Sequence, residues 1–270
     1  MGNQELITQS DYIIALGTLL SCDNEEINEA VVTAIAKNNA EFVYMHPIDD
    51  IDLKVYYSQF IKYEVGSEEG IATLLVDAFV KSSNDTIQNF IDDLDIGYIS
   101  AESSAGEEEF EEAYEKSLDK TNKTLIIGDD IFTHECATSI LKLLAILKQY
   151  AGFTLVILNE KYQNAFDDIS CDSIEEVEEL KSYNGTLLYR YDKPNSDNSL
   201  VGSNSFARVA KVSDGDAILV NFGSEKVEKL FKVDKNLQGT IALCAMGEND
   251  NSAIFDGYRY KQVKIEKVDA

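Results

Sequence analysis

Cysteine and histidine are scarce in this sequence, and their scarcity limits the chemistry that the chain can perform. The four cysteines, Cys22, Cys136, Cys171 and Cys244, form no Cys-x-x-Cys pair, and no histidine lies near them at metal-ligand spacing. We therefore expect free thiols in a reducing compartment and no zinc or iron–sulfur cluster held by this chain alone.

Long apolar runs are also missing. The first residues contain neither a basic segment nor a continuous hydrophobic stretch, and no window reaches the length of a transmembrane helix. The sequence therefore predicts a cytoplasmic protein that is not exported and does not insert into a membrane.

Basic residues are few, with 23 Lys and Arg against 49 Asp and Glu, which gives a formal net charge of −26. This charge repels phosphate backbones and anionic lipid surfaces, so binding to nucleic acid or to a bare bilayer is disfavoured. A basic protein surface is the natural complement, and simple solubility is the alternative explanation of the acidity.

The chain is rich enough in apolar residues, at 44%, to bury a core over 270 residues. Two stretches have the same order of a short apolar strand that ends in glycine, an amphipathic helix and a second apolar strand. The first stretch comprises residues 11–17, a helix capped by Asp23 or Asn24, and residues 41–46; the second comprises residues 123–128, 134–150 and 153–158. Two such units predict a doubly wound parallel sheet with a ligand cleft at the carboxyl ends of its strands.

Other segments are assigned from propensity and capping residues. Ser67 is expected to cap a helix that begins near Glu68, whereas residues 51–61 are ambiguous. Residues 107–115 and 167–179 are acidic and predict helices with a solvated face, and residues 187–191 predict a strand.

A polar stretch at residues 193–199 predicts a domain boundary. We therefore expect an α/β domain over residues 1–192 and a small β domain over residues 200–270. The β domain is predicted from alternating strands at residues 206–212, 217–222, 227–233, 240–245 and 258–268.

Candidate catalytic residues are few. Gly17 and Gly128 each follow a predicted strand and could bring backbone amides close to a phosphate, but neither lies in a dinucleotide-binding or Walker A motif. His46 ends a strand at the expected cleft, and His134 is better placed to cap a helix than to catalyse. No nucleophile or carboxylate can be assigned to either histidine, so the residues define no catalytic site.

The order of these segments resembles the third domain of molybdopterin-family oxidoreductases. In that family an apolar strand ends in a GsNP motif, the next strand ends in DPR, and a PGTDaAL motif opens a helix; residues 12–17, 42–47 and 65–72 are similar to these three segments. Residues 123–128 and the helix after them are similar to the family's next unit, and residues 211–220, with Asp214-Gly215-Asp216, resemble its final β-barrel domain. The resemblance spans residues 11 to 244 and implies that the chain is a carboxy-terminal part, without the family's iron–sulfur segment.

Within the family, the sequence is more similar to the large G subunit of bacterial NADH:quinone oxidoreductase, respiratory complex I, than to the molybdenum enzymes. Leu19 lies where the family has a phosphate-contacting Asn, His46 where it has a nucleotide-binding Asp, and Ile48 where it has an Arg. Leucine donates no hydrogen bond to phosphate, and neutral histidine replaces a carboxylate poorly. The resemblance therefore implies a vestigial pocket, formed by Gly17, Leu19, His46, Gly66 and Ser67, that binds no molybdopterin.

The expected function is thus a non-catalytic structural or assembly domain in the peripheral arm of NADH:quinone oxidoreductase, on the cytoplasmic face of the membrane. Its partners would be other subunits of that complex, met through their basic surfaces. Two alternatives stay open: a fragment of an active molybdopterin-dependent oxidoreductase that holds part of the cofactor, and a stand-alone α/β hydrolase or transferase.

Overall fold

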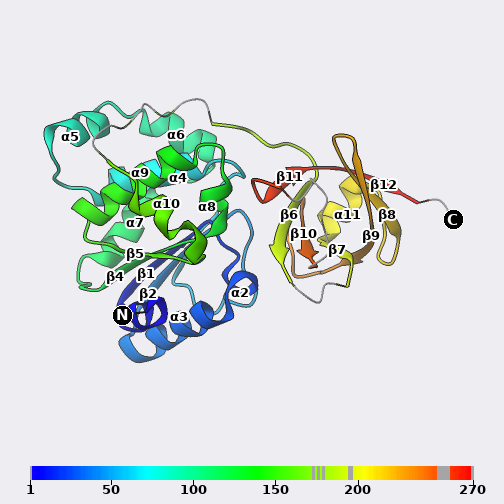
Figure 1. The fold of residues 1–270 in the computed structure, drawn as a ribbon, viewed down its shortest axis with the longest axis horizontal. Coiled ribbons are helices and arrows are strands. Elements are labelled where there is room, and N and C mark those ends of the chain that lie inside the picture. The colour runs from blue at the N-terminus through cyan, green and yellow to red at the C-terminus, as the bar shows by residue number, and fades with distance from the viewer. Residues whose placement is uncertain are drawn as a thin grey trace. The chain divides into compact units, whose positions relative to one another are not determined.

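The computed structural model describes residues 2–171, 174, 177, 180–193, 197–247 and 256–268. The chain forms two compact units, Met1–Ser182 and Tyr183–Ala270, drawn in blue to green and in yellow-green to red in Figure 1.

A parallel five-stranded sheet forms the centre of the first unit, in the order β3-β2-β1-β4-β5. Its strands are β1 (Tyr12–Leu16), β2 (Glu41–Met45), β3 (Gln59–Ile61), β4 (Lys123–Ile127) and β5 (Thr154–Ile157). From β1 the chain adds β2 and β3 on one side of the sheet and then β4 and β5 on the other side. The carboxyl ends of β1 and β4 therefore mark the position at which doubly wound folds bind ligands.

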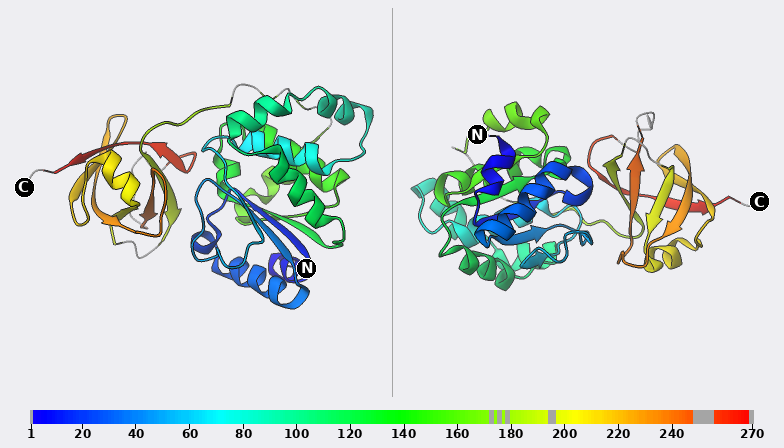
Figure 2. Two further views of the ribbon diagram at one scale, coloured as in Figure 1. Left: turned by 180° about the vertical axis from the view of Figure 1, so that it is seen from behind. Right: turned by 90° about the horizontal axis from the view of Figure 1, so that it is seen from below.

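Helices cover both faces of this sheet, as Figures 1 and 2 show. One face packs against α1 (Asn3–Thr8) and α3 (Glu25–Asn38), with Ile13 and Phe42 in the shared core. The other face packs against α4 (Glu68–Phe79) and α9 (Ala137–Tyr150), with Ile14 and Leu125 in that core. The remaining helices of the unit are α2 (Leu20–Asp23), α5 (Asp85–Asp92), α6 (Ile96–Ser103), α7 (Glu107–Ser117), α8 (Asp129–Thr133), the 3₁₀ turn η1 (Glu160–Tyr162) and α10 (Gln163–Asp167).

Capping residues set the helix ends only in part as expected. Asn24 accepts a hydrogen bond from the Ile27 amide at 3.0 Å, and α3 ends at Asn39 in the left-handed conformation. Ser67 occupies the expected N-cap position of α4, but its side chain makes no capping hydrogen bond.

Two helix boundaries of the first unit differ from the prediction. The helix expected from residue 134 begins at Ala137, because His134 is extended and its ring accepts the Cys136 amide. The helix expected over residues 167–179 is absent where that segment is described: α10 already ends at Asp167, and several later residues lie outside the described part of the chain.

The second unit contains a curled mixed sheet of seven strands, in the order β11-β6-β10-β7-β9-β8-β12. Its strands are β6 (Leu187–Asp192), β7 (Ser199–Gly202), β8 (Ala217–Phe222), β9 (Glu225–Val233), β10 (Ile241–Met246), β11 (Tyr260–Gln262) and β12 (Lys264–Lys267). The expected α/β fold class with a small β domain is therefore confirmed. The domain boundary was placed too late, because β6 pairs with β10 and β11 and so belongs to the second unit.

One predicted strand of this unit is a helix, α11 (Asn204–Ala210). The Ser203 hydroxyl accepts hydrogen bonds from the Ser205 and Phe206 amides, each at 3.0 Å, and starts the helix. Phe206 is then buried against Phe231. The single strand expected over residues 258–268 is divided into β11 and β12, which pair with different strands.

Candidate functional site

The loops that follow β1 and β4 meet at the reversal of the sheet, where a phosphate would bind in a doubly wound fold. The Gly128 amide donates to the Leu16 carbonyl at 2.9 Å, and the Asp130 amide donates to the Gly17 carbonyl at 3.2 Å. A Cβ atom on Gly128 would lie 2.0 Å from the Gly17 carbonyl oxygen, and one on Gly17 would lie 2.8 Å from the Ile131 side chain. The glycines thus permit a close contact between the loops after β1 and β4. The amides of Gly128 and Asp130 donate to carbonyls of the chain.

The loop after β1 is held by two carboxylates of the chain. Asp23 Oδ2 accepts the Thr18 hydroxyl at 2.7 Å and the Leu19 amide at 3.1 Å. Asp50 Oδ2 accepts the Ser21 amide at 3.0 Å. Burial raises the pKa of Asp50, and the hydrogen bond from Ser21 opposes that rise. Carboxylates of the chain therefore occupy one hydroxyl and two amides of this loop that could otherwise donate to an anionic ligand.

His46, at the end of β2, is completely buried and lies 3.1 Å from Asp130, which is also completely buried. His46 Nδ1 lies 3.1 Å from both the amide nitrogen and the carbonyl oxygen of Ile48. Its Nε2 is hydrogen-bonded to the Asp130 carboxylate. This hydrogen bond joins the end of β2 to α8 and presents no group to solvent.

A second buried histidine joins α4 to the segment before α9. His134 Nδ1 accepts the Cys136 amide at 3.0 Å, so Nε2 donates to the Gly66 carbonyl at 3.2 Å and lies 3.4 Å from Glu68. Burial lowers the pKa of His134 and favours the neutral ring. Burial also raises the pKa of Tyr63, and the nearby Glu68 carboxylate adds to that rise.

The five residues of the expected pocket, Gly17, Leu19, His46, Gly66 and Ser67, are all buried. Gly17, Leu19 and His46 follow the carboxyl ends of β1 and β2, while Gly66 and Ser67 precede α4 and are linked to the sequence after β4 through His134. The expected resemblance did not include Asp23, Asp50, Glu68 or Asp130. Their only sequence signal is position, because each lies shortly after a strand end or at the start of α4.

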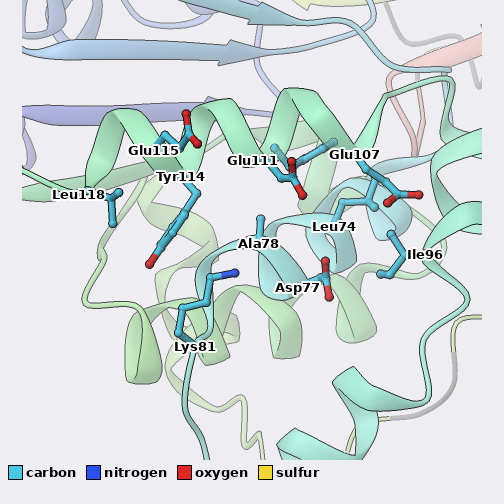
Figure 3. A pocket seen from close by; sticks show the side chains of 11 residues that line it. Leu74, Asp77, Ala78, Lys81, Ile96, Glu107, Glu111, Tyr114, Glu115 and Leu118 are labelled. Atoms are coloured by element: carbon cyan, nitrogen blue, oxygen red, sulfur yellow. The ribbon is translucent and has the colours of Figure 1, made fainter.

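A separate cavity of about 440 Å³ lies between α4, α6 and α7, away from the strand ends (Figure 3). Its lining combines apolar and acidic side chains: Leu74, Asp77, Ala78, Lys81, Ile96, Glu107, Phe110, Glu111, Tyr114, Glu115 and Leu118. We call this feature the α4–α7 groove.

The described residues contain neither a metal-binding cluster nor a membrane-spanning helix. No group of three or more His, Cys, Asp or Glu side chains there is arranged to hold a metal ion. In the same part of the chain, no helix has the length and apolar character needed to cross a membrane.

The fold and this site define a doubly wound α/β unit whose strand-end residues are buried and hydrogen-bonded within the chain, and a curled β unit. A scan against protein-family models finds no match, and a search of curated proteins finds none either. Among solved structures, acetylene hydratase from Pelobacter acetylenicus matches with a TM-score of 0.39 and 7% identity, over 55% of this chain and 23% of the hydratase chain. This chain therefore spans less than a quarter of that protein, and a likeness at this level supports no argument about function.

Proposed function

We propose that the chain is a non-catalytic assembly domain, and that its complex is the peripheral arm of NADH:quinone oxidoreductase, as the sequence resemblance implies. The proposal that the domain is non-catalytic rests on the hydrogen bonds that Asp23 and Asp50 accept from the loop after β1. A phosphate that bound there would have to displace these carboxylates and overcome their negative charge.

The burial of both histidines supports the same proposal. His46 is completely buried and His134 is 7% exposed, so neither ring is open to a substrate. A general base must lie within hydrogen-bond reach of the proton that it removes, and both rings already use their nitrogens within the chain. Their hydrogen bonds connect strand ends to helices, which is a structural role.

The acidic surface supports an assembly role. A formal net charge of −26 favours association with basic surfaces and disfavours anionic ligands. This leaves protein partners as the class of ligand that the chain is best suited to bind.

Co-purification tests the proposed complex. The chain is tagged in its source cells and purified under native conditions from membranes, with the eluate assayed for NADH:quinone reductase activity and for iron. We expect both to copurify with the chain at constant stoichiometry after size-exclusion chromatography. A chain that elutes alone, with neither activity nor iron, would contradict membership of this complex.

A further inference from the structure

The α4–α7 groove is open on a face of the first unit that the strand-end site does not use (Figure 3). Its α7 wall presents Glu107, Glu111 and Glu115, which are four residues apart and so follow one stripe of the helix. Its α4 wall presents Leu74, Asp77 and Ala78, and Lys81 lines the groove just after the end of α4. The acidic rim is therefore a regular feature of two packed helices.

Within the described part of the chain, the carboxylates of this stripe have no cationic partner. Among the described residues, Glu107, Glu111 and Glu115 make no ion pair, although like charges four residues apart destabilise a helix by about 0.2–0.5 kcal/mol per pair. Two other acidic residues of α7 have partners: Glu109 accepts the Gly106 amide at 2.9 Å, and Glu112 pairs with Lys116. Unpaired charge is thus concentrated on the groove side of α7.

Apolar side chains form the interior and one end of the groove. Phe110 and Leu74 are buried in the lining, and Leu118 at the end of α7 is 64% exposed. An exposed leucine beside an apolar cavity offers an anchor point that the isolated chain leaves in contact with water.

Lys81 is the one cation that lines the groove, and its ammonium lies 4.7 Å from the centre of the Tyr114 ring. Asp77 lies beside it on α4, and burial raises the pKa of this carboxyl while Lys81 lowers it and Glu111 raises it. A second cation at the rim would stabilise the ionised form of Asp77.

We propose that the α4–α7 groove binds a basic amphipathic helix of a partner protein, with apolar side chains in the cavity and Lys or Arg side chains on the acidic stripe. Charge complementarity selects this occupant, because a groove that combines apolar side chains with an acidic rim accepts a positively charged amphipathic helix and repels a negatively charged one. The inference rests on the proposed assembly role and names the surface that performs it. A second copy of this chain is a poorer occupant, since each copy has a formal net charge of −26.

A synthetic peptide provides the test. The probe is a fluorescein-labelled helix of about 18 residues with Leu on one face and Lys on both flanks, long enough to form several turns. Its affinity for the full chain is measured by fluorescence anisotropy at about 50 and 200 mM NaCl, because exposed charge pairs weaken with salt. Two control peptides replace every Lys by Glu or scramble the sequence so that the apolar face is lost.

Two double variants with the same change in charge locate the binding site. Glu107→Gln with Glu111→Gln removes two charges from the stripe, whereas Glu108→Gln with Glu112→Gln removes two charges from exposed positions that do not line the groove. We expect the first variant to weaken binding about 5- to 30-fold, as two exposed ion pairs would, and the second by less than about twofold. Leu118→Ser, at an exposed position that should not affect folding, is expected to weaken binding about 3- to 10-fold.

Equal weakening by the two double variants would overturn the proposal, because it would show attraction to the overall charge. Equal binding of the scrambled peptide, or no effect of Leu118→Ser, would also overturn it, because the apolar cavity would then play no part. Sedimentation that shows wild-type dimers, which the Glu107→Gln and Glu111→Gln variant loses, would assign the groove to a second copy of the chain and overturn it likewise.

The failure of this inference can be separated from that of the proposed complex. If the Glu107→Gln and Glu111→Gln variant still copurifies fully with the reductase, the groove is not the docking surface but the assembly role stands. If the wild-type chain elutes without reductase activity while the peptide binds specifically to the groove, the groove stands and the proposed complex is wrong.

Discussion

Asp23 organises the loop after β1 by accepting two hydrogen bonds on one carboxylate oxygen. Asp23→Ala leaves the Thr18 hydroxyl and the Leu19 amide without this acceptor, and Thr18 is completely buried. We expect the free energy of unfolding to fall by about 1–3 kcal/mol, measured by urea denaturation, because buried donors then lose their partner.

Two further substitutions serve as controls for Asp23→Ala. Asp23→Asn keeps a carbonyl acceptor and should lose less stability than Asp23→Ala. Glu29→Gln, at an exposed position on α3, should change the free energy of unfolding by no more than about 0.5 kcal/mol. If Asp23→Ala behaves like Glu29→Gln, the carboxylate does not hold the loop and the strand-end donors are available.

His134 makes a prediction about pH. Burial lowers its pKa in the folded state, so the unfolded state takes up the proton first as the pH falls. The contribution of His134 to stability is therefore complete above the ordinary histidine pKa of about 6.5 and declines below it.

His134→Asn keeps an acceptor near the Cys136 amide but cannot titrate. We expect the variant to be less stable at pH 7, because the bond to Gly66 is lost, and its unfolding free energy to fall less than that of the wild type between about pH 7 and pH 5. Urea denaturation at several pH values measures both quantities. A decline identical to that of the wild type would show that another group causes it.

Helix α7 has two acidic faces that should respond in opposite ways to loss of charge. Glu111→Gln removes repulsion from Glu107 and Glu115 and should raise the free energy of unfolding by about 0.4–1 kcal/mol. Glu112→Gln removes the ion pair with Lys116 and should lower it by about 0.3–0.5 kcal/mol. Thermal or urea denaturation of both variants at low salt makes the comparison, and destabilisation by several kcal/mol in Glu111→Gln would mean that this side chain is packed inward.

The sequence predicted the elements whose apolar periodicity is strong. Strands β1, β2, β4 and β5 and helices α3, α4 and α9 were all expected, because buried parallel strands and two-faced helices leave clear patterns. Helix α11 was mistaken for a strand because seven residues fit either period, and its cap at Ser203 was not recognised. Strand β6 was placed in the wrong unit because its partners β10 and β11 lie more than 40 residues away in sequence.

At the scale of the whole molecule, the sequence predicted the position of the site but not the hydrogen bonds that its residues make. A parallel sheet that reverses between β1 and β4 places the candidate residues near the strand ends. The bonds that occupy this position connect residues distant in sequence, such as His46 with Asp130 and Ser21 with Asp50. No periodicity or local motif encodes such pairs, so they could be identified only in the structure.

We propose that the chain's own carboxylates close the strand-end site and that the protein acts through its surface. Isothermal titration of the full chain with a guanine dinucleotide near neutral pH tests this claim most directly. We expect no saturable heat up to roughly 1 mM ligand, which corresponds to a binding free energy weaker than about −4 kcal/mol. Saturable binding of one equivalent with micromolar or tighter affinity, lost on Leu19→Trp substitution in the β1 loop, would contradict the claim and favour a cofactor-binding oxidoreductase fragment.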